Sequence, residues 1–403
     1  MAPTAAGDHV FTGARVIELA GDPAGEMLGK LLAQMGADVV KVEPPEGSPT
    51  RAIGPFAGER QDPDHSLTFW YYNTNKRSAV VDYRTDEGRD AFLRLVAGAD
   101  VCITTLSRAG LAQLRLRPDD LRRASERLIV VSITPFGLDG PWADRLSSDL
   151  VGLALGSPLN SCGYDDHSIP PIRPGGDQGY QSACSFALMA LLLALIERQS
   201  TGQGQLVDVG MHDCLAVSAE LANPYWFYPK VLVHRQTCRH AQPTPTAPAL
   251  FPCADDRYVY FVLFVADLKP WRALVEWMDT KGLAVDLLAP EYEDARYRQE
   301  HFGHIQDLVE VFFLLQTAEE AYHEGQARGL SIGIAYAPDD LFHDEHLSAR
   351  DFFVTVEHED APPGRYPGPP MRFSDVAPVA PQRAPRLGEH TADVVAGVHG
   401  GDG

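Results

Sequence analysis

Position 177 carries a carboxylate that could take part in chemistry. Asp177 follows a segment rich in proline and glycine and precedes an apolar stretch, residues 178–198, whose composition predicts a buried helix. An aspartate here can simply cap the helix, because its carboxylate accepts hydrogen bonds from the first free backbone amides. A carboxylate on a glycine-rich turn beside those amides also suits charged chemistry. The residues themselves leave both interpretations open.

A second group of polar residues lies between two hydrophobic segments. Asn75, Lys76 and Arg77 form an asparagine-rich turn with two adjacent positive charges. Such a turn is typical of a site for an anionic ligand, although a solvated polar turn has the same composition. His343 and His346 have a spacing that a metal site can use, but acidic residues surround them in a polar loop. We expect a solvated turn there and no metal. A nucleophilic pair of Cys162 and His167 is a weaker alternative.

The elements around these residues alternate between strand and helix. Residues 14–19 predict a strand, residues 26–35 a helix and residues 38–43 a second strand, which makes a βαβ unit. Further strands are expected at residues 79–82, 100–105, 128–133 and 206–209. This alternation predicts an α/β fold with a mostly parallel sheet, in which ligands bind at the carboxyl ends of the strands.

Composition excludes several classes of partner. The chain has 403 residues, with 45% hydrophobic and 22% charged residues, as in ordinary globular enzymes. A net charge of −21 argues against nucleic acid or an anionic membrane surface as a partner. The six cysteines show no CxxC spacing, no signal peptide is visible, and the apolar run at 183–196 is shorter than a membrane span. We therefore expect a soluble protein located in the cytoplasm.

The length fits two domains rather than one. Residues 223–248 are rich in aromatic residues and proline, with little periodicity, and residues 362–370 are rich in proline. We predict a large α/β domain at residues 1–225, a smaller α+β domain at 226–368, and a return of residues 369–403 to the large domain.

Five segments in this order resemble the class III CoA-transferase family, the CaiB/BaiF type, which also includes acyl-CoA racemases. The matching segments are residues 32–44 (LAQMGADVVKVEP), 73–78 (NTNKRS), 136–141 (FGLDGP), 201–209 (TGQGQLVDV) and 387–391 (LGEHT). The resemblance implies a large Rossmann-like domain with a parallel sheet built from both termini, a small inserted domain, and an interlocked dimer.

The resemblance also implies a reaction. An aspartate attacks an acyl-CoA thioester, which gives a mixed anhydride and free CoA thiolate. The thiolate then attacks the anhydride and leaves an aspartyl-CoA thioester, from which an incoming carboxylic acid takes the CoA. Coenzyme A is thus a substrate and product, and the partners are acyl-CoA, a carboxylic acid and a second copy of the chain. A carboxylate needs desolvation and aim to act as a nucleophile.

On this resemblance, Asp177 is the nucleophile, with Gly176 and Gly179 giving close approach and backbone donors for an oxyanion. The chain departs from the family pattern here, because the family's aspartate falls about one helical turn later, where this sequence has Tyr180. Residues assigned to CoA are the adenine-side Lys41, together with Arg51, Asn75, Lys76, Arg77 and Arg108.

Two other functions stay open at this stage. An acyl-CoA racemase would use Asp177 and a histidine such as His167 to move the proton α to the thioester. Alternatively, Tyr180 in place of the family's aspartate would permit a non-catalytic subunit that pairs with an active homologue in a heteromer.

Overall fold

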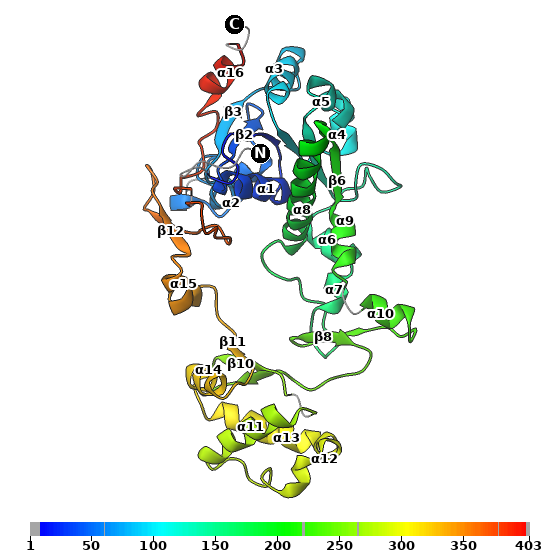
Figure 1. The fold of residues 1–403 in the computed structure, drawn as a ribbon, viewed down its shortest axis with the longest axis vertical. Coiled ribbons are helices and arrows are strands. Elements are labelled where there is room, and N and C mark those ends of the chain that lie inside the picture. Colours follow the sequence, from blue (N-terminus) through cyan, green and yellow to red (C-terminus); the bar gives the residue numbers. More distant parts are fainter. Residues whose placement is uncertain (1–8, 60, 220–221, 264–265, 378, 400–403) are drawn as a thin grey trace. The chain divides into compact units, whose positions relative to one another are not determined.

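The computed structural model describes residues 9–59, 61–219, 222–263, 266–377 and 379–399 (Figure 1). The chain divides into two compact units. Unit 1 comprises residues 1–159, 173–220 and 345–403, and unit 2 comprises residues 160–172 and 221–344. The longer segment of unit 2 starts close to the predicted boundary at 226, but residues 160–172, expected in the large domain, also belong to unit 2. Residues 345–368, expected in the small domain, belong to unit 1.

Unit 1 is built on a six-stranded parallel sheet with the order β3-β2-β1-β4-β5-β6. Its strands are β1 (Arg15–Leu19), β2 (Asp38–Glu43), β3 (Arg77–Val80), β4 (Val101–Thr104), β5 (Ile129–Thr134) and β6 (Leu206–Gly210). The α/β fold with a parallel sheet is confirmed. In this strand order the direction of winding reverses between β1 and β4, and such a switch point leaves a crevice at the carboxyl ends of the strands.

Unit 1 also contains helices, several of which pack on its sheet. They are α1 (Pro23–Gln34), α2 (Leu67–Tyr72), α3 (Asp86–Ala97), α4 (Arg108–Gln113), α5 (Pro118–Ala124), α6 (Asp149–Leu155), α8 (Gln178–Thr201), α9 (Met211–Val217), α15 (Glu345–Ala349) and α16 (Thr391–His399), with α7 (Pro158–Ser161) at the unit boundary. The hairpin of β12 (Phe353–Val356) and β13 (Gly364–Pro367) also belongs to this unit. The ring of His358, between these two strands, stacks on the ring of Trp70 of α2, with the ring centres 4.0 Å apart.

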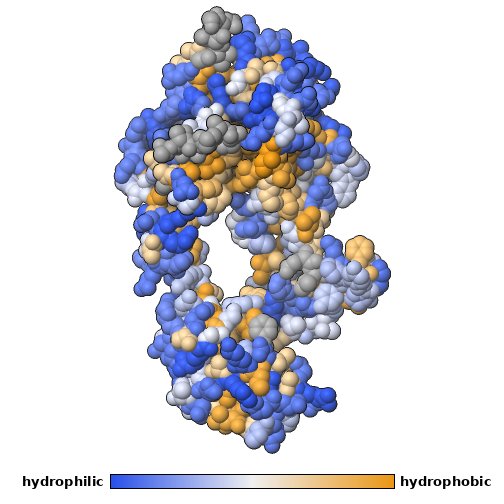
Figure 2. All heavy atoms as spheres, viewed as in Figure 1, coloured by the Kyte–Doolittle hydropathy of each residue, from blue (hydrophilic) through white to orange (hydrophobic). Residues whose placement is uncertain are grey.

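The long helix α8 is buried on one side only. Ala183, Ala187 and Leu191 lie in the core against the sheet, whereas Met189, Leu192, Leu193 and Ile196 are 40–68% exposed. The predicted helix therefore exists, but the expectation that it is buried on all sides is wrong. By length and composition α8 could cross a membrane, yet its buried side packs in the core of unit 1. Figure 2 shows hydrophobic side chains exposed in the region of α1 and α8.

Unit 2 is a smaller α+β structure. Its strands are β7 (His234–Gln236), β8 (Arg239–Gln242), β9 (Leu250–Pro252), β10 (Tyr258–Phe261) and β11 (Ile332–Ile334), and its helices are α10 (Ala222–Phe227), α11 (Leu268–Thr280), α12 (Ala295–Glu300), α13 (Phe302–Leu314) and α14 (Ala318–Ala327). Strands β9, β10 and β11 form an antiparallel sheet. Its aromatic core includes Trp277, Phe312 and Phe313. The backbone of Cys162 forms an isolated β-bridge with Gln236 of β7, and residues 160–172 belong to this unit.

Candidate active site

A cavity of about 560 Å³ opens at the carboxyl ends of β1, β2 and β4. It lies at the switch point of the sheet, where nucleotide-type ligands bind in folds of this kind. Its polar lining includes the hydroxyl groups of Ser48, Thr105 and Ser107 and the carboxyl groups of Asp22 and Glu46. None of the described residues that line it is a lysine or an arginine. A phosphate group bound here would therefore need a lysine or arginine side chain from the rim of the cavity.

Asp22 lies between this cavity and the first turn of α1. Its Oδ1 accepts hydrogen bonds from the amides of Ala24 at 3.0 Å and Gly25 at 3.3 Å, so it caps the helix. Desolvation raises the pKa of this carboxyl to about 7, and the neighbouring Glu26 adds to the increase. The cap hydrogen bonds oppose the shift but do not cancel it. A carboxyl group with a pKa raised in this way keeps its proton at pH values where an exposed aspartate is fully ionised.

This shift predicts a pH-dependent effect of Asp22→Asn on stability. The pKa of Asp22 is higher in the folded chain than its ordinary value of 3.8, so between these two pH values the folded state binds the extra proton and wild-type stability falls as pH rises. Asparagine keeps the cap and carries no charge. We expect the melting temperature of Asp22→Asn to exceed that of the wild type increasingly from pH 4 to pH 7 and then by a constant margin. A pH-independent difference in thermal melts would contradict this.

Asp177 lies at the amino end of α8, which packs against β5 and leads into β6. In such a crossover the helix runs opposite to the strands, so this end faces the carboxyl edge of the sheet. Asp177 has left-handed backbone angles (φ 53°, ψ 47°) and its side chain caps no amide of the helix. Instead its Oδ1 accepts a hydrogen bond from Arg173 at 2.8 Å, and the side chain is 36% exposed.

The interpretation of Asp177 as a simple side-chain cap is therefore wrong. A capping residue normally has extended backbone angles, which aim its side chain at the first amides; the left-handed turn directs the Asp177 carboxylate elsewhere. Asp149 of α6 takes the capping role, because its Oδ1 accepts from the amide of Gly179 at 2.7 Å and from that of Tyr180 at 3.4 Å. Asp149 also pairs with Arg173 at 3.0 Å.

Tyr180 lies among three carboxyl groups. Burial raises the pKa of its phenol to about 12, and Asp22, Asp149 and Asp177 add to this increase. Asp22 after β1, Asp149 at the start of α6 and Asp177 before α8 therefore all lie near the side chain of Tyr180. Asp177 likewise contributes, after burial, to the raised pKa of Tyr72. No motif in the sequence points to Asp149, which lies 28 residues before Asp177 in the chain.

The glycines assigned to an oxyanion site differ in their surroundings. Gly176 has a φ of 79°, so this residue and Asp177 form a left-handed turn that a side chain at position 176 would strain. Gly179 already donates its amide to Asp149, and a Cβ there would come within 2.9 Å of the same carboxylate. The amide of Gly179 can serve an oxyanion only if it gives up Asp149, so its role as a donor stays a prediction.

Lys41 and Lys76 lie in a buried network of charges beneath the cavity. Lys41 donates to Glu26 at 2.8 Å and to Glu18 at 3.1 Å, and Lys76 donates to Glu18 at 2.7 Å. Desolvation acts to lower the pKa of Lys41, but Glu26, Glu18 and Glu43 together hold it above its ordinary value. Both lysines are almost completely buried. Their position gives them an internal role, in which they neutralise carboxylates of the fold.

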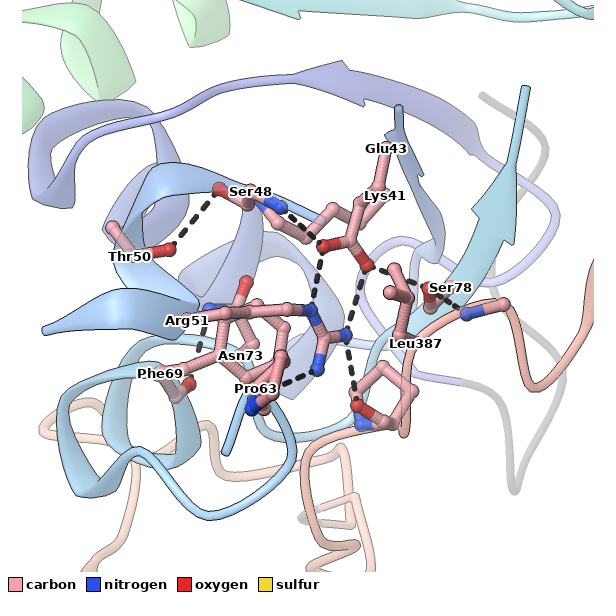
Figure 3. A network of polar contacts seen from close by, with 12 residues as sticks. Lys41, Glu43, Ser48, Thr50, Arg51, Pro63, Phe69, Asn73, Ser78 and Leu387 are labelled. Atoms are coloured by element: carbon pink, nitrogen blue, oxygen red, sulfur yellow. Dashed lines mark hydrogen bonds and ion pairs between the residues drawn. The ribbon is translucent and has the colours of Figure 1, made fainter. Parts of the chain in front are cut away.

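Arg51 has a similar internal position (Figure 3). Its guanidinium donates to both oxygens of Glu43, at 2.7 and 2.9 Å, and to Asp64 at 2.9 Å. It also donates to the carbonyl of Pro385 at 3.1 Å and covers the ring of Phe69 at 3.7 Å. Arg51 therefore ties the C-terminal segment to the edge of the sheet.

The remaining residues assigned to CoA lie nearer the surface. Asn75 donates to the carbonyl of Ala380 at 2.7 Å and so holds the C-terminal segment. Arg77 pairs with Asp38 at 2.6 Å. Arg108 directly follows Ser107 of the cavity wall, is 48% exposed and pairs with the equally exposed Asp144. An exposed pair of this kind is weak, so a phosphate could displace Asp144. Arg108 is the best placed of the six.

The other predicted residues are not among those that line this cavity. His167 and Cys162 belong to unit 2, where a ring nitrogen of His167 lies 3.0 Å from the carbonyl of Arg235. His343 and His346 lie in a short helical turn and at the start of α15. Within the described part of the chain, no group of three or more His, Cys, Asp or Glu side chains is placed to hold a metal ion.

A doubly wound parallel sheet with a cavity at its switch point and carboxyl groups beside it defines an α/β protein for a nucleotide-type ligand. Comparison with known proteins identifies the family. The model of CoA-transferase family III matches residues 11–391, so the chain belongs to this family of class III CoA-transferases, which confirms the resemblance seen in the sequence.

Individual relatives agree with this membership. The chain is 31% identical over 390 residues to the succinyl-CoA:(R)-benzylsuccinate CoA-transferase subunit BbsE of Thauera aromatica, covering 96% of this chain and 93% of that one. It is 31% identical to the succinate–glutarate CoA-transferase of Agrobacterium fabrum, covering 96% and 95%. The crystal structure of a CaiB/BaiF family protein from Brucella suis matches with a TM-score of 0.83 at 26% identity, covering 97% and 100%.

Proposed function

We propose that this chain transfers CoA from an acyl-CoA thioester to a carboxylic acid through Asp177. The carboxylate attacks the thioester carbonyl, and the C–S bond breaks to give an acyl-aspartyl anhydride and CoA thiolate. The thiolate attacks the aspartyl carbonyl, which releases the donor acid and forms an aspartyl-CoA thioester. The acceptor carboxylate then attacks the carbonyl of this thioester, which gives an anhydride between Asp177 and the acceptor and releases CoA thiolate again. The thiolate attacks the acceptor carbonyl of this anhydride, so the acceptor leaves as its CoA thioester and the Asp177 carboxylate is restored.

The observation that carries this proposal is the position of Asp177 on a left-handed turn at the amino end of α8. Its carboxylate is not used as a cap, since Asp149 performs that task. Arg173 holds the carboxylate at 2.8 Å, which orients it but also weakens it as a nucleophile. We infer that Arg173 turns fully to Asp149 when the thioester binds, because it already contacts both carboxylates.

The cavity at the carboxyl ends of β1, β2 and β4 supports the placement of the CoA nucleotide there. Its volume of about 560 Å³ lies within the range of ligand pockets, about 300–1,000 Å³. Near neutrality Asp22 is partly protonated, which reduces repulsion of an anionic ligand. We propose Arg108 at the rim as the phosphate contact, while Lys41, Arg51 and Lys76 hold the fold beneath the site.

The names of the relatives suggest the class of acid. Several of them describe transfer involving succinate, benzylsuccinate, glutarate, citramalate and mesaconate, which are all dicarboxylic acids, and two others name formyl-CoA and oxalate. We propose a dicarboxylate as acceptor or donor here. A dicarboxylate bound as a CoA thioester keeps one free carboxylate, and that charge requires a cation or several donors in the protein.

The proposal is tested by incubating the purified chain with succinyl-CoA and an unlabelled dicarboxylic acid and following the new thioester by mass spectrometry. Hydroxylamine added during turnover should convert residue 177 to a hydroxamate, which peptide mass spectrometry detects. Transfer without any modification at residue 177 would contradict the role of Asp177.

A second function is favoured by one observation. On the family resemblance, Tyr180 occupies the place of the family's aspartate, and the relative from Thauera aromatica is named as a subunit. A non-catalytic subunit would show no CoA transfer alone and would gain it only with an active homologue. Transfer by the purified chain alone would exclude this function.

We propose that two copies of the chain associate, interlocked as the family resemblance implies, and that the exposed side of α8 lies in their interface. Met189, Leu192, Leu193 and Ile196 form an apolar strip that is 40–68% exposed. Contiguous apolar surface of this kind marks an interaction site in soluble proteins. The strip covers nearly two turns of the helix, because its positions repeat at three and four residues.

Leu193→Glu should therefore weaken the dimer. Leu193 is 68% exposed in one chain, so the charge costs little within the unit but is buried without a partner when two copies associate. We expect the mass measured by light scattering to shift from dimer toward monomer. Glu310→Gln, on α13 of unit 2, is a control that should leave the mass unchanged. An unaltered dimer of Leu193→Glu would place the interface elsewhere.

A further inference from the structure

Unit 2 contains a cavity of about 360 Å³ that the reaction scheme does not use. It is lined by residues from the 160–172 segment, the β7–β8 hairpin and the segment after it. Its charged and aromatic-ring lining residues are Asp165, His167, His234, Arg235 and Arg239. Its volume is at the lower end of the range for ligand pockets, about 300–1,000 Å³, and fits a small organic molecule.

Two guanidinium groups border this cavity with hydrogen-bonding capacity to spare. Arg239 is 8% exposed at its side chain and pairs with Asp165, while it also donates to Gln236 at 3.2 Å. Among the described residues, Arg235 donates to two backbone carbonyls, at 2.5 Å to Ile169 and 3.3 Å to His167. The Nε atoms of both arginines are buried, and among the described residues neither has a hydrogen-bond partner.

Buried N–H groups without a partner are rare in folded proteins, and each one calls for an explanation such as a bound ion or water. These two Nε atoms are not exposed to the cavity, but both arginines line it, and two cations on the wall of one small cavity point to an anion. Each guanidinium offers a planar fork of donors that matches a carboxylate. His167 and His234 also line the cavity, with ring centres 5.7 Å apart.

The walls of the cavity are held in place before any ligand arrives. Pro243, Pro245 and Pro248 form one side, and their fixed φ angles limit the motion of this segment. Gly163 lets Arg235 approach closely, because a Cβ there would lie 2.6 Å from the Cδ and 2.8 Å from the Nε of that arginine. A preorganised site loses less entropy when it binds.

We propose that this cavity is a binding site for a short dicarboxylate anion, with Arg235 and Arg239 each contacting one carboxylate. The evidence for a binding site is the pair of cations and the size of the cavity. The choice of the acid as the substrate of the transferase rests on the proposed function. A dicarboxylate that regulates the enzyme would bind to the same groups. Kinetic measurements distinguish a bound substrate from a bound regulator.

The site is tested by titrating the full-length chain with succinate in a calorimeter. Arg239→Gln removes a charge-assisted donor and leaves Asp165 beside the cavity, so we expect affinity to fall about tenfold or more. Asp165→Asn removes the competing carboxylate, so we expect tighter binding by a few-fold. A merely structural role would make both variants weaker. Arg272→Gln, an exposed arginine of the same unit paired with Glu293, is the matched control and should bind like the wild type.

Each outcome decides a separate point. If Arg239→Gln binds succinate like the wild type, or Asp165→Asn binds it less tightly, the site is refuted. If Arg239→Gln raises the KM for the acid with little change in kcat, the site serves the substrate; if it alters kcat at saturating acid with the KM unchanged, the ligand is a regulator and the substrate assignment fails. If the binding pattern holds but no CoA transfer is found, the proposed function fails while the site stands.

Discussion

Asp177→Asn should abolish CoA transfer while leaving the fold intact. Loss of a covalent nucleophile typically lowers kcat by about 10⁴-fold or more, because no other group can form the anhydride. The side chain is 36% exposed, caps no helix amide and, among the residues that the structure describes, pairs with the half-exposed Arg173. Exposed pairs contribute about 0.2–1 kcal/mol to stability. We therefore expect a nearly unchanged melting temperature together with no detectable transfer from succinyl-CoA.

Asp149→Ala is the matched control for that variant. Asp149 is buried and accepts from the Gly179 amide at 2.7 Å, so its removal leaves a buried donor unsatisfied and deprives Arg173 of a partner. That costs about 1–3 kcal/mol. The two neighbouring aspartates should thus differ in stability. Asp149→Ala lowers the melting temperature as well as the rate, because Arg173 is then left with Asp177 as its carboxylate, whereas Asp177→Asn lowers the rate alone. Equal losses of activity and stability in both variants would show that Asp177 is structural.

The architecture of unit 1 could be predicted from the sequence because its signals are local. Each strand of the sheet is a short run of β-branched residues bounded by glycine or a polar turn, as in residues 38–43. The helix α8 was evident from its composition. Its one-sided burial was not, because an apolar residue such as Leu193 has the same appearance whether it faces the core or a second chain.

The candidate site was less predictable because its chemistry depends on pairs that are distant in the chain. Lys41 and Lys76 are indistinguishable in sequence from phosphate-binding lysines, yet both contact Glu18, which precedes Lys76 by 58 residues. The capping role of Asp149 depends equally on a tertiary contact. Arg108 differs from these cations only by exposure, and exposure is a property of the fold.

Lys41→Met should destabilise unit 1 severely. Lys41 is fully buried and is the shared partner of Glu18 and Glu26, at 3.1 and 2.8 Å. Removing one member of a buried ionic group leaves the others uncompensated and costs about 3–5 kcal/mol, a large part of the 5–15 kcal/mol that stabilises a typical domain. We expect a fall in melting temperature of about 10 °C or more, measured by thermal unfolding without ligand.

Two arginine variants show whether that result reflects burial or CoA binding. Arg77→Gln breaks a partly exposed pair with Asp38 and should change stability by no more than about 1 kcal/mol. Arg108→Gln should weaken CoA affinity with the melting temperature unchanged, since Arg108 is half-exposed and pairs only with exposed Asp144. If Lys41→Met were as stable as the wild type and lost only CoA affinity, Lys41 would be the ligand contact. The charge beneath the cavity would then serve binding rather than the fold.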